Sequence, residues 1–236
     1  METFYASPQE IAPPALTITG DEFSHLTHVM RMRVGEAIRV VDGTGNAYDA
    51  LISELKPRAA MCTIRAHHRF LHEPPRAITL GAGLLKNPSR FDFLVEKAVE
   101  LGVSRIDPLR TERTIAQQAK VERWQKLCLA AMKQSGRCVL PHVEELKPFD
   151  AFLSQAEAGA LRLIAHEHAT EPIAAAIGGD WERAVVCVGP EGGFSDEEVA
   201  RAERAGFHAV SLGPRRLRSE TAAIVAVSFA LQSDAR

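Results

Sequence analysis

The segment Val-Gly-Pro-Glu-Gly-Gly-Phe-Ser at residues 188–195 contains residue types that could form a ligand site. It follows an apolar run, and its glycines would let backbone N–H and C=O groups approach a ligand closely. It has neither the Gly-Lys-Ser/Thr of a P-loop nor the G-x-G-x-x-G of a dinucleotide fold. Glu191 would repel a polyphosphate, so the loop favours a neutral or cationic ligand. The alternative is a tight turn before a helix capped by Ser195 and Glu198.

A second loop, Ser-Leu-Gly-Pro-Arg-Arg-Leu-Arg-Ser-Glu-Thr-Ala at residues 211–222, again leads from a strand-like run toward a helix. Arg215, Arg216 and Arg218 place three guanidinium groups at the start of that helix. Arginine is suited to bidentate recognition of phosphates and carbonyl edges. We therefore interpret the loop as the place where an anionic or nucleic-acid substrate meets the ligand of the first loop. The alternative is a solvated basic turn.

The sequence His166-Glu167-His168 follows a third apolar run at residues 161–165. Two histidines at this spacing invite comparison with a metal site, but no third or fourth ligand has a credible spacing. We therefore predict no metal. A hydrolase of the Ser-His-Asp type is also disfavoured, because the chain lacks a G-x-S-x-G segment.

The elements that must position these loops alternate between strands and helices after about residue 76. Apolar runs predict strands at residues 77–85, 103–109, 161–165, 184–188 and 209–212. Helical patterns follow or separate them, beginning with one capped by Ser89 and continuing at residues 120–135, 172–177, 196–205 and 220–231. This alternation is typical of a mostly parallel sheet covered by helices. Ligands bind such sheets at the carboxyl ends of the strands, where the three loops begin.

Residues 1–72 have a different pattern. Short strand-like runs at residues 15–19, 37–42, 47–51 and 60–66 are separated by turns rich in Gly and Asn, and predict a small antiparallel sheet or barrel. Two prolines within residues 72–76 indicate a stiff linker to the second domain.

The composition of the 236 residues is that of an ordinary soluble globular protein, with 46% hydrophobic and 25% charged residues. A formal net charge of −2 argues against a histone-like electrostatic binder, so contacts with nucleic acid must come from local patches. The excess of Lys and Arg lies within residues 73–150. The four cysteines form no C-x-x-C pair and are expected to be reduced structural thiols. No signal peptide and no membrane span are evident, so we expect a cytoplasmic protein.

The two loops together resemble those of the RsmE family, the small-subunit ribosomal RNA uridine-N3 methyltransferases of the SPOUT class. Four further segments match family motifs in the same order: His-Val-Met-Arg-Met at 28–32, Glu-Lys-Ala-Val-Glu-Leu-Gly-Val at 96–103, Thr-Glu-Arg-Thr at 111–114 and Lys-Gln-Ser-Gly-Arg at 133–137. The resemblance extends from about residue 25 to residue 231. Two features depart from it: residues 1–8 contain no arginine, and Arg216 stands where an apolar residue is usual.

The resemblance implies an α/β trefoil-knot (SPOUT) methyltransferase domain at residues 73–236, which binds S-adenosylmethionine, and a PUA-like β-barrel RNA-binding domain at residues 1–72. It implies a homodimer that methylates N3 of a uridine in the decoding region of 16S ribosomal RNA, within the small ribosomal subunit. The alternative is a noncatalytic RNA-binding or ribosome-assembly factor that retains the fold without affinity for the cofactor.

The resemblance also directs the choice of site residues. Arg218 is the candidate for stabilising negative charge on the base, and Glu220 or Glu191 for accepting its proton or orienting it. The expected cofactor-binding residues are His166, Glu167, Gly189, Pro190, Glu191, Gly192, Gly193, Leu212, Gly213, Leu217, Thr221 and Ala222. The expected RNA-binding residues are Arg31, Arg33, Lys86, Arg90, Arg113, Arg137 and Arg215.

Overall fold

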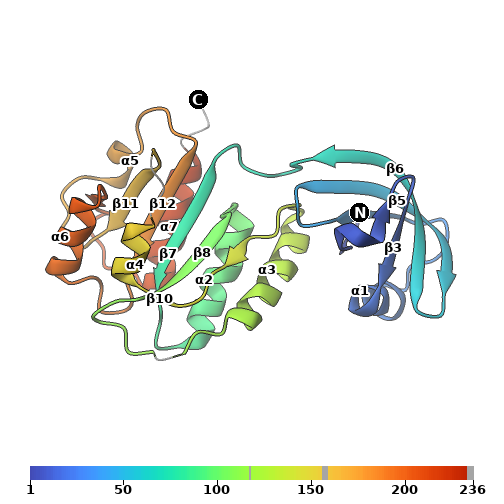
Figure 1. Ribbon diagram of the computed structural model, residues 1–236, viewed down its shortest axis with the longest axis horizontal. Helices are drawn as coiled ribbons and strands as arrows, with labels where there is room; N and C mark the ends of the chain where they lie inside the picture. The colour runs from blue at the N-terminus through green and yellow to red at the C-terminus, as the bar shows by residue number, and fades with distance from the viewer. Residues whose placement is uncertain (117, 156–158, 233–236) are drawn as a thin grey trace. The chain divides into compact units, whose positions relative to one another are not determined.

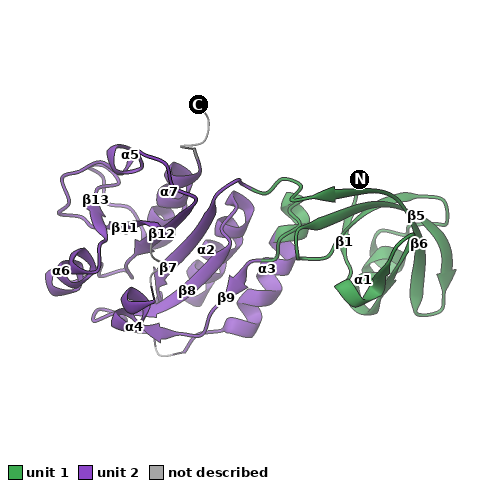
Figure 2. Ribbon diagram, turned by 45° about the horizontal axis from the view of Figure 1, so that its top comes forward, with its two compact units in different colours: residues 1–73, 132–140 green, residues 74–131, 141–236 purple. Residues whose placement is uncertain are grey.

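The computed structural model describes residues 1–116, 118–155 and 159–232. The chain divides into two compact units (Figure 2): unit 1 comprises residues 1–73 and 132–140, and unit 2 comprises residues 74–131 and 141–236. The short segment 132–140, which the sequence analysis assigned to the second domain, therefore belongs to unit 1.

Unit 1 is built around a six-stranded sheet with the order β1-β4-β5-β6-β3-β2. Its strands are β1 (Thr3–Tyr5), β2 (Ile11–Ala12), β3 (Ala15–Thr19), β4 (Ala37–Val41), β5 (Asn46–Lys56) and β6 (Ala59–Arg69). β1 runs parallel to β4, and the other neighbours are antiparallel. Its helical turns are η1 (Pro8–Glu10), α1 (Gly20–Ser24) and η2 (His25–Val29).

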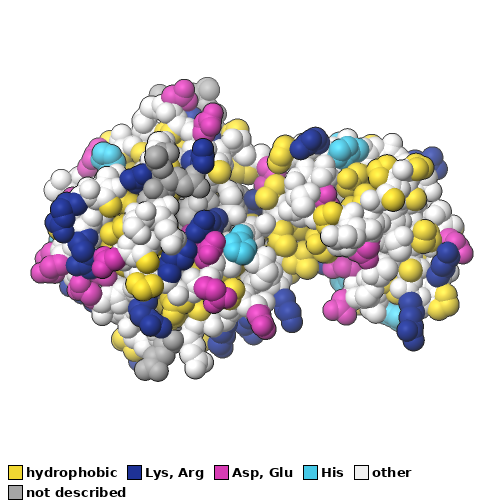
Figure 3. Space-filling view, viewed as in Figure 1, with side chains coloured by type: hydrophobic (Ala, Val, Ile, Leu, Met, Phe, Trp, Pro, Cys, Tyr) yellow, Lys and Arg dark blue, Asp and Glu magenta, His cyan; other side chains and the backbone are white. Residues whose placement is uncertain are grey.

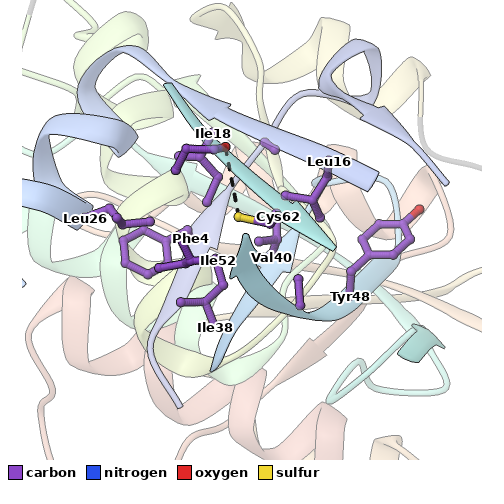
Figure 4. Packing of buried hydrophobic residues seen from close by; sticks show 12 residues of the cluster. Phe4, Leu16, Ile18, Leu26, Ile38, Val40, Tyr48, Ile52 and Cys62 are labelled. Atoms are coloured by element: carbon purple, nitrogen blue, oxygen red, sulfur yellow. Dashed lines mark hydrogen bonds between the residues drawn. The ribbon is translucent and has the colours of Figure 1, made fainter. Parts of the chain in front are cut away.

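Alternating apolar residues give the sheet of unit 1 its buried face. In β3, Leu16 and Ile18 are buried while their neighbours are more exposed, as the period of a strand requires. These side chains pack with Phe4, Leu26 and Ile52 in a single apolar cluster (Figure 4). This core explains why residues 1–72 fold as the small β-domain that their pattern predicts.

Unit 2 is a parallel sheet with the order β10-β8-β7-β12-β11-β13, and β9 pairs with β8 (Figure 1). Its strands are β7 (Ala77–Gly83), β8 (Arg105–Arg110), β9 (His142–Val143), β10 (Lys147–Pro148), β11 (Leu161–Ala165), β12 (Arg183–Val188) and β13 (His208–Val210). Its helices are α2 (Pro88–Leu101), α3 (Val121–Ser135), α4 (Phe149–Ser154), α5 (Ile173–Ala176), α6 (Asp196–Arg204) and α7 (Ser219–Gln232). α7 contacts β7 and β12 and also packs against α2. All pairings within this sheet are parallel, as the alternation of elements predicts.

The starts of the helices partly match the sequence analysis. The capping box of Ser195 and Glu198 at the start of α6 is confirmed. The predicted cap by Ser89 is wrong: Asn87 caps α2 by accepting a hydrogen bond from the Ser89 N–H. The physical reason is Pro88, whose fixed φ and missing N–H suit the first helical position and move the cap one residue before it.

Surface charge, the hydropathy of the helices and the burial of the cysteines complete the description. Side chains of both charge signs are interspersed over the face in Figure 3, in keeping with the small net charge. Over the described parts of the chain, the helices are all too short or too polar to span a bilayer. All four cysteines are buried, and none of them is joined in a disulfide.

Candidate active site at the carboxyl ends of the sheet

Three neighbouring strands bring the three predicted loops together. Ala165 at the end of β11 pairs with Val188 of β12 on one side and with Val210 of β13 on the other. The backbone N–H of His166 then donates to the Val210 carbonyl at 3.1 Å. The loops that follow β11, β12 and β13 therefore begin side by side at one edge of the sheet.

The loop after β12 is packed so closely that side chains would not fit along part of it. A Cβ at Gly189 would lie 2.8 Å from the carbonyl carbon of Gly193, and a Cβ at Gly83 would overlap the backbone nitrogen of Pro190. Beyond the turn, the buried ring of Phe194 packs on Phe149 with the ring centroids 5.0 Å apart. The glycines are thus required for the loop to lie against the end of β7.

Glu191 holds this loop to the exit of β7. The backbone N–H of Lys86 donates to both carboxylate oxygens of Glu191, at 3.0 and 3.3 Å. Both oxygens of Glu191 are therefore engaged within the protein itself.

The turn after β8 holds the same loop from the other side. The Arg113 guanidinium donates to the Gly192 carbonyl at 2.7 Å. The backbone N–H of Glu112 donates to the buried Glu198 carboxylate at 2.9 Å, and that carboxylate also accepts from the Ser195 N–H. The glycine loop and the start of α6 are therefore fixed from two neighbouring strand ends.

The glycines leave open space at two points of the site. Gly193 and Gly213 have φ values of +70° and +105°, in the region that favours glycine. A Cβ at either position would meet no atom within 4 Å. The two loops therefore fit a ligand that approaches the backbone at these residues. Arg215, Arg216 and Arg218 are exposed in the second loop.

Glu220, in the first turn of α7, is a buried carboxylate with an unshared oxygen. It is 7% exposed, and its Oε2 has no hydrogen-bond partner. Its Oε1 lies 3.7 Å from Nε of Arg90, a half-buried side chain on the first turn of α2. A buried acceptor without a donor costs free energy, typically about 1–3 kcal/mol. Oε2 is therefore suited to accept a proton or a hydrogen bond from a ligand.

His166 lies at the start of the loop after β11 with only 10% of its side chain exposed. Burial and, to a smaller extent, the neighbouring His168 lower the pKa of His166. The ring is therefore neutral at neutral pH. No group of three or more metal-ligating side chains occurs within the described ranges.

The residues predicted to contact RNA have diverse surroundings. Arg31, Arg33, Lys86 and Arg215 are exposed. Arg90 faces Glu220, and Arg113 contacts the glycine loop. Arg137 requires a correction, because it is only 3% exposed and pairs with Glu73 at 2.7 Å within unit 1. A buried guanidinium already bound to a carboxylate is not available to an RNA phosphate.

Comparison with known families defines the class of protein. The family model described as the RNA methyltransferase domain matches residues 72–231, and the RNA methyltransferase PUA domain matches residues 18–64. The first match covers most of unit 2 with all three site loops. The fold and the site are thus those of an RNA methyltransferase with a PUA-like domain.

Individual relatives narrow the class to one family. The chain is 32% identical to the ribosomal RNA small subunit methyltransferase E of a Synechocystis species, over 94% of this chain and 74% of the relative. It is 34% identical to the enzyme of that name from Neisseria gonorrhoeae, solved with S-adenosyl methionine, with a TM-score of 0.90 over 99% and 97% of the two chains. A methyltransferase of Legionella pneumophila, solved with the same cofactor, is 32% identical with a TM-score of 0.82 over 98% and 96%.

The chain belongs to the ribosomal RNA small subunit methyltransferase E family. These likenesses confirm the predicted fold class, a SPOUT α/β knot domain with a PUA-like domain at the N-terminus.

Proposed function

We propose that this chain transfers a methyl group from S-adenosylmethionine to N3 of a uridine in the decoding region of 16S ribosomal RNA. The observation that carries the proposal is the unshared, buried Oε2 of Glu220, in the helix that follows one of three adjoining loops. Two relatives similar over nearly their whole length were solved with this cofactor, which supports its assignment to the same loops here.

The loops fit the cofactor in shape and charge. The open space at Gly193 and Gly213 can admit a ligand against the backbone. When bound, S-adenosylmethionine supplies a methyl group attached to a positively charged sulfur. A neutral His166 and the carboxylate of Glu191 suit such a cation better than a polyphosphate. The proposed cofactor-binding residues are His166, Glu167, Gly189, Pro190, Glu191, Gly192, Gly193, Leu212, Gly213, Leu217, Thr221 and Ala222.

Glu220 is the proposed acceptor of the proton on uracil N3. Methyl transfer would form a bond from N3 to the methyl carbon and break the bond from that carbon to sulfur, so that the sulfur leaves with the bonding pair as a neutral thioether. The N3–H bond must also break, and its proton must leave. Oε2 of Glu220 has no other donor to satisfy it, whereas both oxygens of Glu191 already accept from Lys86. A positioned base of this kind typically contributes about 10²–10⁴ to the rate.

Arg218 is the proposed stabiliser of the negative charge that develops on the uracil carbonyl oxygens. Its guanidinium is exposed in the segment that leads into α7, two residues before Glu220. A fixed cation near a developing oxyanion lowers the barrier most when water is excluded around it.

Exposed cations would hold the RNA. Arg31 and Arg33 on unit 1, and Lys86 and Arg215 on unit 2, can contact phosphates in a salt-dependent manner. We assign the small ribosomal subunit as the substrate particle and the cytoplasm as the compartment, since the relatives carry a small-subunit name.

The composition of α7 supports a homodimer, which we include in the proposal. Residues 222–231 of this helix are almost all apolar, yet Phe229 is 39% exposed. A helix that is apolar on all sides is normally buried, so a second copy of the chain is the proposed cover.

Transfer of labelled methyl from S-adenosylmethionine to small ribosomal subunits that lack their native modification tests the proposal. We expect label in 16S ribosomal RNA of assembled subunits and loss of it with Glu220→Gln. If calorimetry shows that the cofactor binds but no methyl group is transferred to any ribosomal RNA, the proposal that 16S ribosomal RNA is the substrate would be contradicted. Absence of both binding and transfer would favour the noncatalytic RNA-binding alternative.

A further inference from the structure

Arg113 contacts the glycine loop with both its head and its stem. Its Nη1 donates to the Gly192 carbonyl at 2.7 Å. A Cβ at Gly192 would lie 3.1 Å from Cβ and 3.2 Å from Cδ of Arg113, so the aliphatic stem runs along the glycine. Because Gly192 has no side chain, the stem of Arg113 can lie directly against its backbone.

The turn that carries Arg113 is itself held in place. Thr111 is buried, and its N–H donates to Oγ1 of Thr114 at 2.9 Å. The Thr114 N–H donates back to the Thr111 carbonyl at 3.1 Å. The Glu112 N–H donates to Glu198 of α6, and Arg201 of α6 donates to the Glu112 carboxylate at 3.2 Å. Arg113 thus projects from a turn fixed to the helix that follows the glycine loop.

The peptide group between Gly192 and Gly193 is held at both ends. Its carbonyl accepts from Arg113, and its N–H donates to the Pro190 carbonyl at 2.9 Å. A peptide with both polar groups bonded cannot rotate without breaking one of them. This peptide leads directly into Gly193, whose open side is the proposed approach of the cofactor.

We propose that Arg113 is a positioning residue for the cofactor loop, which fixes the 192–193 peptide, rather than chiefly a contact to RNA. The proposal rests on the proposed function only in taking this loop as the cofactor site. The Thr-Glu-Arg-Thr turn at residues 111–114 then increases the affinity for the cofactor, whether or not RNA is bound.

Calorimetric titration of the full chain with S-adenosylmethionine, in the absence of RNA, measures the contribution of Arg113 to the Kd of the cofactor. A hydrogen bond to a charged donor is lost in Arg113→Gln, so we expect the Kd to rise about 10-fold or more. Arg113→Lys can still donate one N–H and should recover part of the affinity. Arg204→Gln removes an exposed arginine of α6 and serves as the matched control, with an unchanged Kd.

Steady-state kinetics separate positioning from other roles. A positioning role predicts a raised KM for the cofactor, with kcat at saturating cofactor and the unfolding temperature close to those of the unmodified chain. A raised KM for the RNA substrate with an unchanged cofactor Kd would overturn the proposal. Loss of affinity in Arg113→Gln and Arg113→Lys alike, accompanied by a lower unfolding temperature in both, would overturn it in favour of general destabilisation. If the unmodified chain binds no S-adenosylmethionine, the proposed function itself fails, which the first titration reveals.

Discussion

Glu191 lies in the loop after β12 and Glu220 in the first turn of α7, and the surroundings of the two carboxylates differ. The Glu191 oxygens accept two hydrogen bonds from one backbone N–H, and the Glu220 Oε2 accepts none. The donor to Glu191 belongs to the protein, so this carboxylate stabilises the loop. The Glu220 Oε2 has no donor in the protein and can therefore accept one from a substrate. The residue types alone leave both open as proton acceptors.

Substitution of each glutamate by glutamine should therefore have different kinetic effects. Glu220→Gln removes the base and should lower the single-turnover rate by about 100-fold or more, with the cofactor Kd nearly unchanged. Glu191→Gln weakens the hold on the Lys86 N–H and should chiefly raise the cofactor Kd. Single-turnover methylation and calorimetry on both variants check this. A Glu220→Gln enzyme with an undiminished rate at saturating cofactor would remove Glu220 from the reaction.

The lowered pKa of His166 predicts a pH dependence of cofactor binding. Burial disfavours the charged ring, so His166 stays neutral until the pH falls below its ordinary pKa of 6.5. Protonation then adds a positive charge close to Arg113 and to the proposed site of the cationic cofactor. The affinity should be constant between about pH 8 and pH 7 and decline on the acid side of 6.5. Because the folded pKa is lowered, the stability from His166 is also present above 6.5 and lost as the pH falls.

Titrations of the unmodified chain and of His166→Gln at matched pH values provide the measurement. The variant should show a flatter acid limb. An identical acid decline in both proteins would assign the effect to another group.

The roles of single residues are only partly predictable from the sequence. The glycines of the loops could be predicted, because a turn between strand and helix has a local signature. The roles of Arg90, Arg113 and Arg137 could not, since their partners lie far along the chain: Glu220, Gly192 and Glu73, respectively. The sequence around an arginine is the same whether its guanidinium is exposed to solvent or bonded to a carbonyl far along the chain.

At the scale of elements, the site depends on how closely β7 and the loop after β12 approach. Gly83 ends β7, and any Cβ there would overlap the backbone of Pro190. Gly83→Ala should therefore displace the loop, lower the stability by about 1–3 kcal/mol and weaken cofactor binding. Gly178→Ala is the control, because its Cβ would lie 3.8 Å from the nearest atom at an unstrained φ. Chemical denaturation and calorimetry check both; equal behaviour of the two variants would show that the contact is not required.

The elements themselves were largely predictable. Runs of apolar and β-branched residues located β3 and β11 at their observed bounds and overlap seven further strands. The two- and three-residue strands β1, β2, β9 and β10 were not predicted. Segment 132–140 was not assigned to unit 1, because its attachment depends on Glu73. That carboxylate accepts from Arg137 and from the backbone N–H groups of Cys138 and Val139. Such long-range bonds have no local pattern.

At the scale of the whole molecule, two features exceed what local patterns can show. Composition and alternation predict a parallel sheet with a separate β-domain, but not a knotted connection, because true knots are very rare. The resemblance of six ordered segments supplied that expectation. The second feature is the oligomeric state, which a single chain indicates only through apolar surface.

The apolar surface of α7 predicts that substitution of Phe229 changes the mass of the oligomer in solution. Phe229→Asp places a charge on the proposed contact between copies and should convert a dimer into monomers. Size-exclusion chromatography with light scattering measures it, and Lys126→Asp on the exposed face of α3 provides a charged control. A monomeric unmodified chain at micromolar concentration would contradict the homodimer.

The identity of the methylated nucleoside decides whether the chain carries out the proposed reaction at uracil N3. Small ribosomal subunits methylated by the purified chain would be digested to nucleosides and separated by chromatography with mass spectrometry, against standards of the methyluridine isomers. N3-methyluridine is the expected product, since Glu220 is the proposed acceptor of the N3 proton. Methylation at the ribose 2′-oxygen or at C5 would contradict it, because neither product requires the loss of that proton.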